Sequence, residues 1–242
     1  MNSLTRYERH LILPGVGDEG QQKINSARVL IVGMGGLGSP VALYLAAAGV
    51  GTMGLSDFDL VEESNLQRQV IHSMQSIGKP KVESARERIN ALNPHINVAV
   101  HNVKLDSENA VGIIKSYDII ADCSDNFETR YILNEACVLL EKPCIHGSIF
   151  EFRGQVSVFC TEEGPCYRCL YPEPPPGRVF GTLGTLPGII GSIMANETLK
   201  LILKAPNLAG RLLLFNAWET NFKELRVEKD ENCPICGKNI VT

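Results

Sequence analysis

A short apolar run that leads into a glycine-rich turn constrains the fold of this chain more than any other feature. Residues 28–32 read Arg-Val-Leu-Ile-Val, which is typical of a buried parallel strand. Segment 37–48 is rich in Ala and Leu and is followed by Gly49, so it predicts a helix with a glycine at its end. A strand, a glycine turn and a helix in this order predict a phosphate-binding turn at the start of an α/β unit.

The spacing of the glycines supports that interpretation. They are Gly33, Gly35, Gly36 and Gly38. Gly33 allows the tight turn, Gly35 lets a phosphate approach the backbone, and Gly38 lets the helix pack on the strand. The N-terminus of the helix adds free N–H groups, which attract an anion. NAD, FAD and ATP all fit such a turn equally well.

Strand-like and helix-like segments alternate through the middle of the chain. Further strand-like segments lie at 51–56, 96–100, 117–121 and 143–146, and helix-like segments at 81–92 and 127–140. This alternation predicts an α/β fold with a Rossmann-like, doubly wound and mostly parallel sheet. After Gly154 the order changes to a strand-like segment at 155–159, a helix near 189–203 and a strand pair within 212–227. We expect these later strands to extend the same sheet, partly antiparallel.

Composition limits the classes of partner. The formal net charge is −4, so the chain has no global field for nucleic acid or an anionic membrane. No apolar run follows the N-terminal charges as it does in a signal peptide, and the longest apolar stretch, 41–50, is too short to span a bilayer. We therefore expect a cytoplasmic protein that binds neither nucleic acid nor membrane.

An acidic residue and a polar segment follow the second expected strand. Asp57 closes that strand about twenty residues after the glycines, where a carboxylate accepts hydrogen bonds from ribose hydroxyls. The polar residues just beyond it are Asp59, Asn65, Arg68 and Gln69. Lys81 opens the next helix. Because Arg and Lys side chains bind a triphosphate and neutralise charge in its transition state, this segment favours ATP over a nicotinamide cofactor.

A second acidic position follows the strand-like segment 117–121. Asp125 and Asn126 lie just beyond its C-terminal end, and open α/β sheets carry their ligands at that edge. A carboxylate beside a triphosphate is a suitable ligand for Mg²⁺. We therefore predict that Asp125 binds the magnesium of bound ATP, with Asn126 completing the nucleotide site.

Read in order, these motifs form a specific set. They are Arg6-Tyr-x-Arg9-His10, the glycine turn, Asp57-x-Asp59, Ser64-Asn65-Leu-x-Arg68-Gln69, Lys81-Val-Glu-Ser-Ala, Asp122-x-x-Asp125-Asn126 and two CxxC pairs. The set resembles the MoeB/ThiF/HesA family, the bacterial relatives of ubiquitin-activating enzymes, over nearly the whole chain. The resemblance implies an adenylyltransferase that activates the C-terminal glycine of a small ubiquitin-like sulfur-carrier protein, of the MoaD or ThiS type, and releases pyrophosphate.

The resemblance also implies residue roles and partners. By the motif match, ribose would be bound by Asp57, phosphates by Asn65, Arg68 and Lys81, and magnesium by Asp125. A homodimer is implied, in which Arg9 reaches into the partner's ATP site, together with a separate sulfurtransferase or sulfide donor. The chain is predicted to be one adenylation domain over 1–242, divided into an N-terminal helical arm (1–26), a nucleotide-binding half (27–153) and a carrier-binding and zinc half (154–242).

Four of the eight cysteines form two pairs with metal-ligand spacing. They are Cys166, Cys169, Cys233 and Cys236. Four thiolates satisfy tetrahedral Zn²⁺ and leave no open position, so we predict a structural zinc site that ties the C-terminal residues to the loop after Phe159. A redox CxxC pair is the alternative, but two pairs in one compact domain favour a metal.

The other cysteines bear on whether a covalent step occurs. Because they lie in or beside apolar segments, we expect buried, inert thiols at Cys123, Cys137, Cys144 and Cys160. Many members of the resembled family carry a transferring cysteine in the loop after the first zinc pair, whereas 171–187 contains none. We therefore expect an acyl-adenylate without a covalent enzyme–carrier intermediate. Molybdopterin, thiamin, tRNA-thiolation and cysteine pathways all remain open, and the missing cysteine favours molybdopterin.

Two other classes of protein stay open at this point. A NAD- or FAD-dependent oxidoreductase accounts for the glycine turn and Asp57, but leaves Arg9, Arg68, Lys81 and the cysteine pairs unexplained. A non-catalytic module that docks a ubiquitin-like protein would keep the fold without the reaction.

Overall fold

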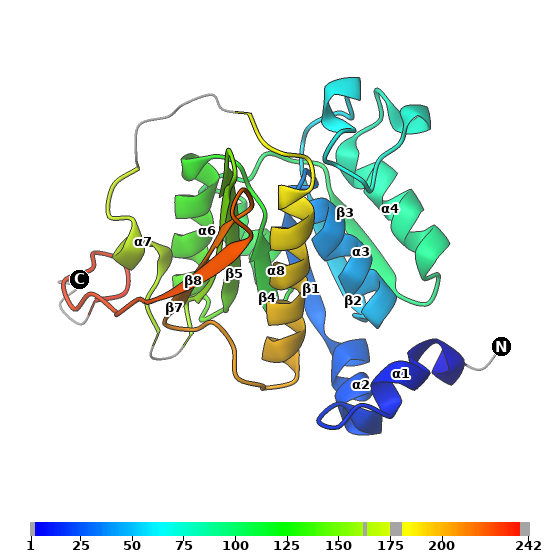
Figure 1. The fold of residues 1–242 in the computed structure, drawn as a ribbon, viewed down its shortest axis with the longest axis horizontal. Coiled ribbons are helices and arrows are strands. Elements are labelled where there is room, and N and C mark those ends of the chain that lie inside the picture. Colours follow the sequence, from blue (N-terminus) through cyan, green and yellow to red (C-terminus); the bar gives the residue numbers. More distant parts are fainter. Residues whose placement is uncertain (1–2, 162–163, 175–180, 238–242) are drawn as a thin grey trace.

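One eight-stranded sheet organises the computed structural model, which describes residues 3–161, 164–174 and 181–237 (Figure 1). Its strand order is β3-β2-β1-β4-β5-β6-β7-β8. The strands are β1 (Arg28–Val32), β2 (Thr52–Ser56), β3 (Asn97–His101), β4 (Ile119–Asp122), β5 (Cys144–Phe150), β6 (Arg153–Phe159), β7 (Arg211–Asn216) and β8 (Asn221–Arg226). The first five strands of this order, β3, β2, β1, β4 and β5, pair in parallel. The pairs β5–β6, β6–β7 and β7–β8 are antiparallel, which confirms the predicted mixed sheet.

Helices cover both faces of the sheet. The longer ones are α2 (Gly17–Ser26), α3 (Gly38–Ala48), α4 (Lys81–Leu92), α6 (Phe127–Leu139) and α8 (Leu186–Ile202). Shorter ones are η1 (Ser3–Tyr7), α1 (Glu8–Leu11), η2 (Glu63–Asn65), η3 (Met74–Ser76), α5 (Ala110–Ile114) and α7 (Tyr167–Leu170). Of the described helices, none is long and apolar enough to cross a membrane.

Alternate residues of β1 feed two separate cores. Val29 and Ile31 belong to a cluster with α3, α4 and α8, whereas Leu30 and Val32 belong to one with α5 and α6. Because successive side chains of a strand point to opposite faces, this division places α3, α4 and α8 on one face of the sheet and α5 and α6 on the other. The inner parallel strands β1, β2 and β4 are therefore buried on both faces, as their continuous apolar sequences predict.

The N-terminal helices dock at the amino edge of the sheet. The Tyr7 ring lies against Gly49, at the C-terminal end of α3, and its hydroxyl accepts a hydrogen bond from Asn93. Gln21 on α2 donates to the carbonyl of Ala48 at the same end of α3. The glycine turn sits at the other end of α3, and Figure 1 shows α1 and α2 on the side of the sheet opposite the loops that follow β1 and β4.

Candidate functional site

The strand order places a crevice between β1 and β4. These strands are direct neighbours, with Val32 paired to Asp122, yet the chain leaves β1 for α3 on one face and β4 for α6 on the other. Ligands of open α/β sheets bind where two neighbouring strands send their connections in opposite directions. The glycine turn and the loop 122–126 therefore meet where a ligand is expected.

Two glycines make the turn possible. Gly33 has a φ of +92°, and a Cβ on it would lie 2.7 Å from the carbonyl oxygen of Cys123 on the neighbouring loop. A Cβ on Gly38, at the start of α3, would overlap the carbonyl oxygen of Gly33. The turn is thus tight, as its spacing predicts, and it also packs against loop 122–126.

Asp57 binds the backbone of this turn. Its carboxylate accepts hydrogen bonds from the backbone N–H of Met34 (2.7 Å) and of Asp59 (2.8 Å). Burial raises the pKa of Asp57, against the effect of those two bonds and of the Lys81 charge. The Lys81 Nζ atom, on a residue only 6% exposed, lies 2.7 Å from an oxygen of Asp59. Asp57, Asp59 and Lys81 thus form one charged cluster beside the turn.

His72, which was not predicted from the sequence, contacts the backbone of the same turn. It is buried, and its Nε2 atom lies 2.9 Å from the carbonyl oxygen of Met34. Its Nδ1 atom lies 2.9 Å from the hydroxyl of Ser84 on α4. Burial lowers the pKa of His72, so the neutral ring donates from Nε2 and accepts from the hydroxyl at Nδ1. A single histidine in an otherwise ordinary segment gives no sequence signal for this role.

The segment after η2 lies over the glycines. The Gln69 amide lies beside Gly35, and the stem of Arg68 lies beside Gly36. The Arg68 guanidinium donates to the carbonyl of Ser64, the single hydrogen bond of this side chain among the described residues. Asn65 is buried and caps the same 3₁₀ turn by accepting from the N–H of Glu62. Arg68 is therefore placed to meet a ligand, while Asn65 shapes the segment that carries it.

Asp125 and Asn126 have different surroundings, although both are exposed. The side chain of Asn126 accepts from the N–H of Thr129 and so caps the N-terminus of α6. Asp125 lies beside it, with a 3.5 Å contact to the Asn126 amide as its one side-chain hydrogen bond in the described part of the chain. Its carboxylate is therefore open to a cation, which fits the predicted magnesium role.

Arg9 does not lie at this site. It is exposed on α1, which follows the Tyr7 anchor at the C-terminal end of α3. The 11 residues of α3 separate that anchor from the glycine turn by about 16 Å along the helix axis. Arg9 of one chain is therefore remote from the crevice of the same chain.

A buried polar network that the sequence did not predict supports loop 122–126. Asp122, 2% exposed, accepts from the N–H and hydroxyl of Ser124 (3.0 and 2.6 Å) and lies 2.7 Å from Nδ1 of His146. Burial opposes ionisation, but the His146 hydrogen bond lowers the pKa of Asp122; burial lowers the pKa of His146. Asp122 is therefore the charged partner. Arg130, on α6, donates to the Ser124 carbonyl at 3.0 Å.

The four paired cysteines converge. All four Sγ atoms lie within 4.8 Å of one another, with separations of 3.6 Å for Cys166–Cys233, 3.4 Å for Cys169–Cys236 and 3.9 Å for Cys166–Cys169. Tetrahedral zinc with Zn–S bonds of about 2.3 Å requires sulfurs about 3.8 Å apart. Without a cation, burial raises the pKa of Cys166 to about 11. The cluster thus fits a metal site with four cysteine ligands.

Three of the remaining thiols are buried, as predicted. Cys123, Cys137 and Cys144 are buried. Burial raises the pKa of Cys123 well above its usual value, and a hydrogen bond with Cys144 does so for Cys137. Cys160 departs from the prediction because it is partly exposed, at the end of β6, although burial of its sulfur raises its pKa as well. The predicted cysteine-free loop 171–187 falls partly outside the described residues, which omit 175–180.

Sequence comparison identifies the family. The chain matches the ThiF family over residues 7–235, and it belongs to that family. A Thermus thermophilus protein named sulfur carrier protein adenylyltransferase is 50% identical, over 97% of this chain and 91% of that protein. The probable adenylyltransferase/sulfurtransferase MoeZ of Mycobacterium tuberculosis is 48% identical, over 96% of this chain and 62% of that protein.

Other relatives are also longer than the region they share with this chain. The adenylyltransferase and sulfurtransferase MOCS3 of Culex quinquefasciatus is 46% identical, over 98% of this chain but only 56% of that protein. Among solved structures, E. coli MccB with AMPCPP and MccA superposes with a TM-score of 0.88 at 22% identity, over 98% of this chain and 75% of that one. That likeness shows the α/β fold.

Proposed function

We propose that this chain uses ATP to adenylate the C-terminal glycine of a small ubiquitin-like sulfur-carrier protein, with release of pyrophosphate. The observation that carries the proposal is the glycine turn of a ThiF-family chain with Asp57 and Arg68 in contact with it. Lys81 is paired with Asp59 beside Asp57, and the loop that carries Asp125 packs against Gly33. The relatives described above are named as adenylyltransferases, which gives no support to an oxidoreductase or to a non-catalytic docking module.

The reaction needs no side-chain nucleophile. A carboxylate oxygen of the carrier attacks the α-phosphorus of ATP, and the bond to the bridging oxygen of pyrophosphate breaks. Asp57 holds the ribose, while Arg68 and Lys81 neutralise the charge that gathers on the leaving group. Magnesium, held by the open Asp125 carboxylate, would supply further charge neutralisation at the phosphates. The protein's contribution is therefore positioning and electrostatics.

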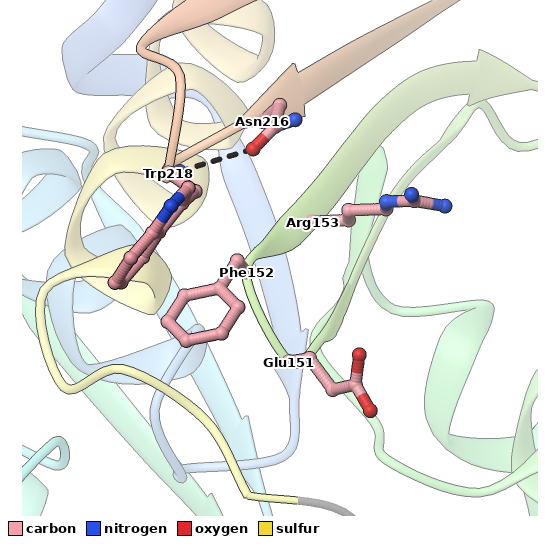
Figure 2. A pocket seen from close by; sticks show the side chains of 5 residues that line it. All are labelled: Glu151, Phe152, Arg153, Asn216 and Trp218. Atoms are coloured by element: carbon pink, nitrogen blue, oxygen red, sulfur yellow. Dashed lines mark hydrogen bonds between the residues drawn. The ribbon is translucent and has the colours of Figure 1, made fainter.

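An aromatic surface at the same edge of the sheet as the crevice suits the carrier. Strand β5 ends at the same edge as β1 and β4, and Arg153 on β6 pairs with Asn216 at the end of β7. The rings of Phe152 and Trp218 there lie 4.8 Å apart between centroids, beside a hollow of about 250 Å³, and Trp218 is 76% exposed. Figure 2 shows the two rings together. Exposed aromatic residues of this kind anchor protein partners.

A homodimer would complete the site. Arg9 lies at the wrong edge of its own sheet but is exposed and has no hydrogen bond or ion pair among the described residues. Large apolar side chains are also exposed in the segment that follows β2, namely Phe58, Leu60, Val70 and Met74, and Ile12 is exposed in the N-terminal arm. Burying such a surface favours association. We propose that the partner subunit covers it and supplies its own Arg9 to the site.

Three further features belong to the proposal. Zinc would bind the four-cysteine cluster in a purely structural role, because four protein ligands leave no position for a substrate. The buried thiols support an acyl-adenylate as the end product on the enzyme, with a separate sulfurtransferase or sulfide donor completing the reaction. A cytoplasmic location accords with a metal site made of reduced cysteines.

The test is ATP–pyrophosphate exchange with labelled pyrophosphate, run with and without a MoaD- or ThiS-type carrier. Exchange that requires both the carrier and its C-terminal glycine supports the proposal, and NADH binding without any response to ATP would overturn it. Mixing Arg9→Ala with Asp125→Ala protein tests the shared site. Partial recovery of activity is expected, because each mixed dimer then holds one intact site, whereas no recovery in proven mixed dimers would refute it.

A further inference from the structure

The metal cluster has a neighbour that is neither a cysteine nor on its loops. Asn134 lies in the middle of α6 and is only 2% exposed. Its Nδ2 atom lies 3.7 Å from the Sγ atom of Cys166, within hydrogen-bond distance for sulfur. Its Oδ1 atom accepts from the backbone N–H of Tyr167 at 2.7 Å and from the thiol of Cys160 at 3.6 Å. Every polar atom of this side chain is thus directed at the cysteine segments.

The orientation of the Asn134 amide is fixed by its partners. The N–H of Tyr167 can only donate, so the atom that faces it must be the amide oxygen. The amide nitrogen then faces Cys166, which as a metal ligand is a thiolate and can only accept. The opposite orientation would place two donors face to face at Tyr167 and the amide oxygen against a negative sulfur. The side chain is therefore matched to a metal-bound Cys166.

Charge explains why such a donor is needed. Four thiolates around one Zn²⁺ leave a net charge of −2 in a partly buried site, which N–H donors to sulfur offset. The backbone N–H of Asp230 gives one such bond to Cys169 at 3.4 Å. Groups behind metal ligands orient them and tune the affinity for the metal.

We infer that Asn134 is a positioning residue of the zinc site, whose amide nitrogen donates to the Cys166 thiolate and fixes that ligand against α6. The inference rests on the zinc site proposed above and does not depend on the proposed adenylation. It assigns a metal-directed role to a residue between the nucleotide crevice and the cysteine loops.

The test replaces the donor and keeps the shape. Asn134→Asp retains an acceptor for Tyr167 and puts a negative oxygen against Cys166. Asn134→Ala removes the hydrogen bonds to both Tyr167 and Cys166. The matched control is Asn93→Asp, because Asn93 is fully buried and its amide donates to Tyr7 and Ala46, away from the cysteines. Zinc affinity is measured by competition with a chelator, and stability by denaturant unfolding of the zinc-free and zinc-loaded forms.

We expect zinc affinity to fall about 10- to 100-fold in Asn134→Asp, less in Asn134→Ala and not at all in Asn93→Asp. A merely structural Asn134 would instead destabilise both forms equally, with unchanged zinc affinity, and that result would overturn the inference.

A measurement on the unaltered protein decides the matter if the variants do not fold. With ¹¹³Cd in place of zinc, NMR should show scalar coupling from the Asn134 side-chain N–H to the metal through the N–H···S bond. The N–H of Asp230 provides the internal standard. Coupling at Asp230 without coupling at Asn134 would refute the inference.

Discussion

The parallel and the antiparallel half of the sheet differ in how deeply their strands are buried. Strands β1, β2 and β4 are almost wholly buried between two layers of helices, whereas every residue of β8 is exposed. The parallel half can hold a crevice rigidly because its loops leave a dry, close-packed scaffold. In the antiparallel half, β6 and β7 still contribute Val156, Val158 and Phe215 to the core with α8, and exposure grows outward to β8. The proposed function places catalysis in the buried parallel half and carrier docking in the more exposed antiparallel half.

Helix α6 joins the two regions. Its Arg130 holds the Ser124 carbonyl in the loop of the nucleotide crevice. One turn later its Asn134 holds the cysteine segment. The two buried polar side chains lie four residues apart, so they share one face of the helix.

The strongest test of this division removes charge from the crevice. Arg68→Ala should reduce pyrophosphate exchange about 100- to 1000-fold, because the proposed function assigns to Arg68 the stabilisation of charge in the transition state. Folding stability should be unchanged, since Arg68 makes one hydrogen bond to a backbone carbonyl. Arg88→Ala, on the exposed face of α4, is the matched control. Equal exchange rates for both variants would remove Arg68 from the site.

Removing zinc should affect the other half. Structural zinc contributes about 10 kcal/mol or more to the folding of small domains, so its chelation should open the region it holds. Hydrogen–deuterium exchange is expected to rise sharply in 164–174 and 228–237 and to stay low in β1, β2 and β4. Added Zn²⁺ should restore protection. Uniform loss of protection across the sheet would show that the halves do not differ as described.

Docking should depend on the aromatic surface more than on the crevice. Trp218→Ala should raise the KM for the carrier about 5- to 30-fold, with kcat nearly unchanged, since buried aromatic anchors contribute about 1–2 kcal/mol. Tyr44→Ala on α3 is the control, because Tyr44 is also an exposed aromatic residue, at 58%. A fall in kcat at unchanged KM would contradict a docking role.

The smallest expected effect is a pH dependence of stability. Burial lowers the pKa of His72, so the fold favours its neutral form. Its contribution is complete above about pH 6.5, the value for an unfolded histidine, and is lost as pH falls from there through the folded pKa. The melting temperature should therefore fall less between pH 7.5 and 5.5 in His72→Gln than in the unaltered protein.

A matched substitution checks that assignment. His95 is exposed, so His95→Gln should leave the pH dependence as it is. Burial also lowers the pKa of His101 and of His146, so part of the dependence should persist in His72→Gln. A His72→Gln protein with the full acid-induced loss would contradict the neutral-ring assignment.

Much of the fold follows from local sequence signals. The expected strand at 28–32 and helix at 81–92 are confirmed with the same bounds, because apolar runs, helical spacing and the Asn93-Pro94 stop are local. Helix α5 was missed, since its five residues are too few to show a period. The four-cysteine cluster was predicted from spacing and is confirmed as a cluster. The prediction was possible because the CxxC spacing itself indicates that both thiols of a pair can bind one metal ion.

Contacts between segments distant in the sequence could not be predicted from it. His72 meets Met34 across 38 positions, and nothing in either segment identifies the other. Arg130 and Asn134 offered one usable signal, because polar residues four apart in an apolar helix indicate a shared buried partner. The pairing of Lys81 with Asp59 was likewise unpredicted, although each was named separately. Which of these residues touch a nucleotide remains a prediction.

The exposed outer strand has a consequence for how the protein behaves in concentrated solution. Strand β8 ends the sheet, so its outward N–H and C=O groups have no neighbouring strand among the described residues. Its sequence Asn-Phe-Lys-Glu-Leu-Arg places charges at Lys223, Glu224 and Arg226, between and beside Phe222 and Leu225. Charged side chains on an outer strand discourage a second sheet from adding to it, because pairing would bury or oppose them. Replacing Lys223 and Arg226 with valine should therefore make the protein aggregate through this edge strand, without disturbing either the crevice or the cysteines.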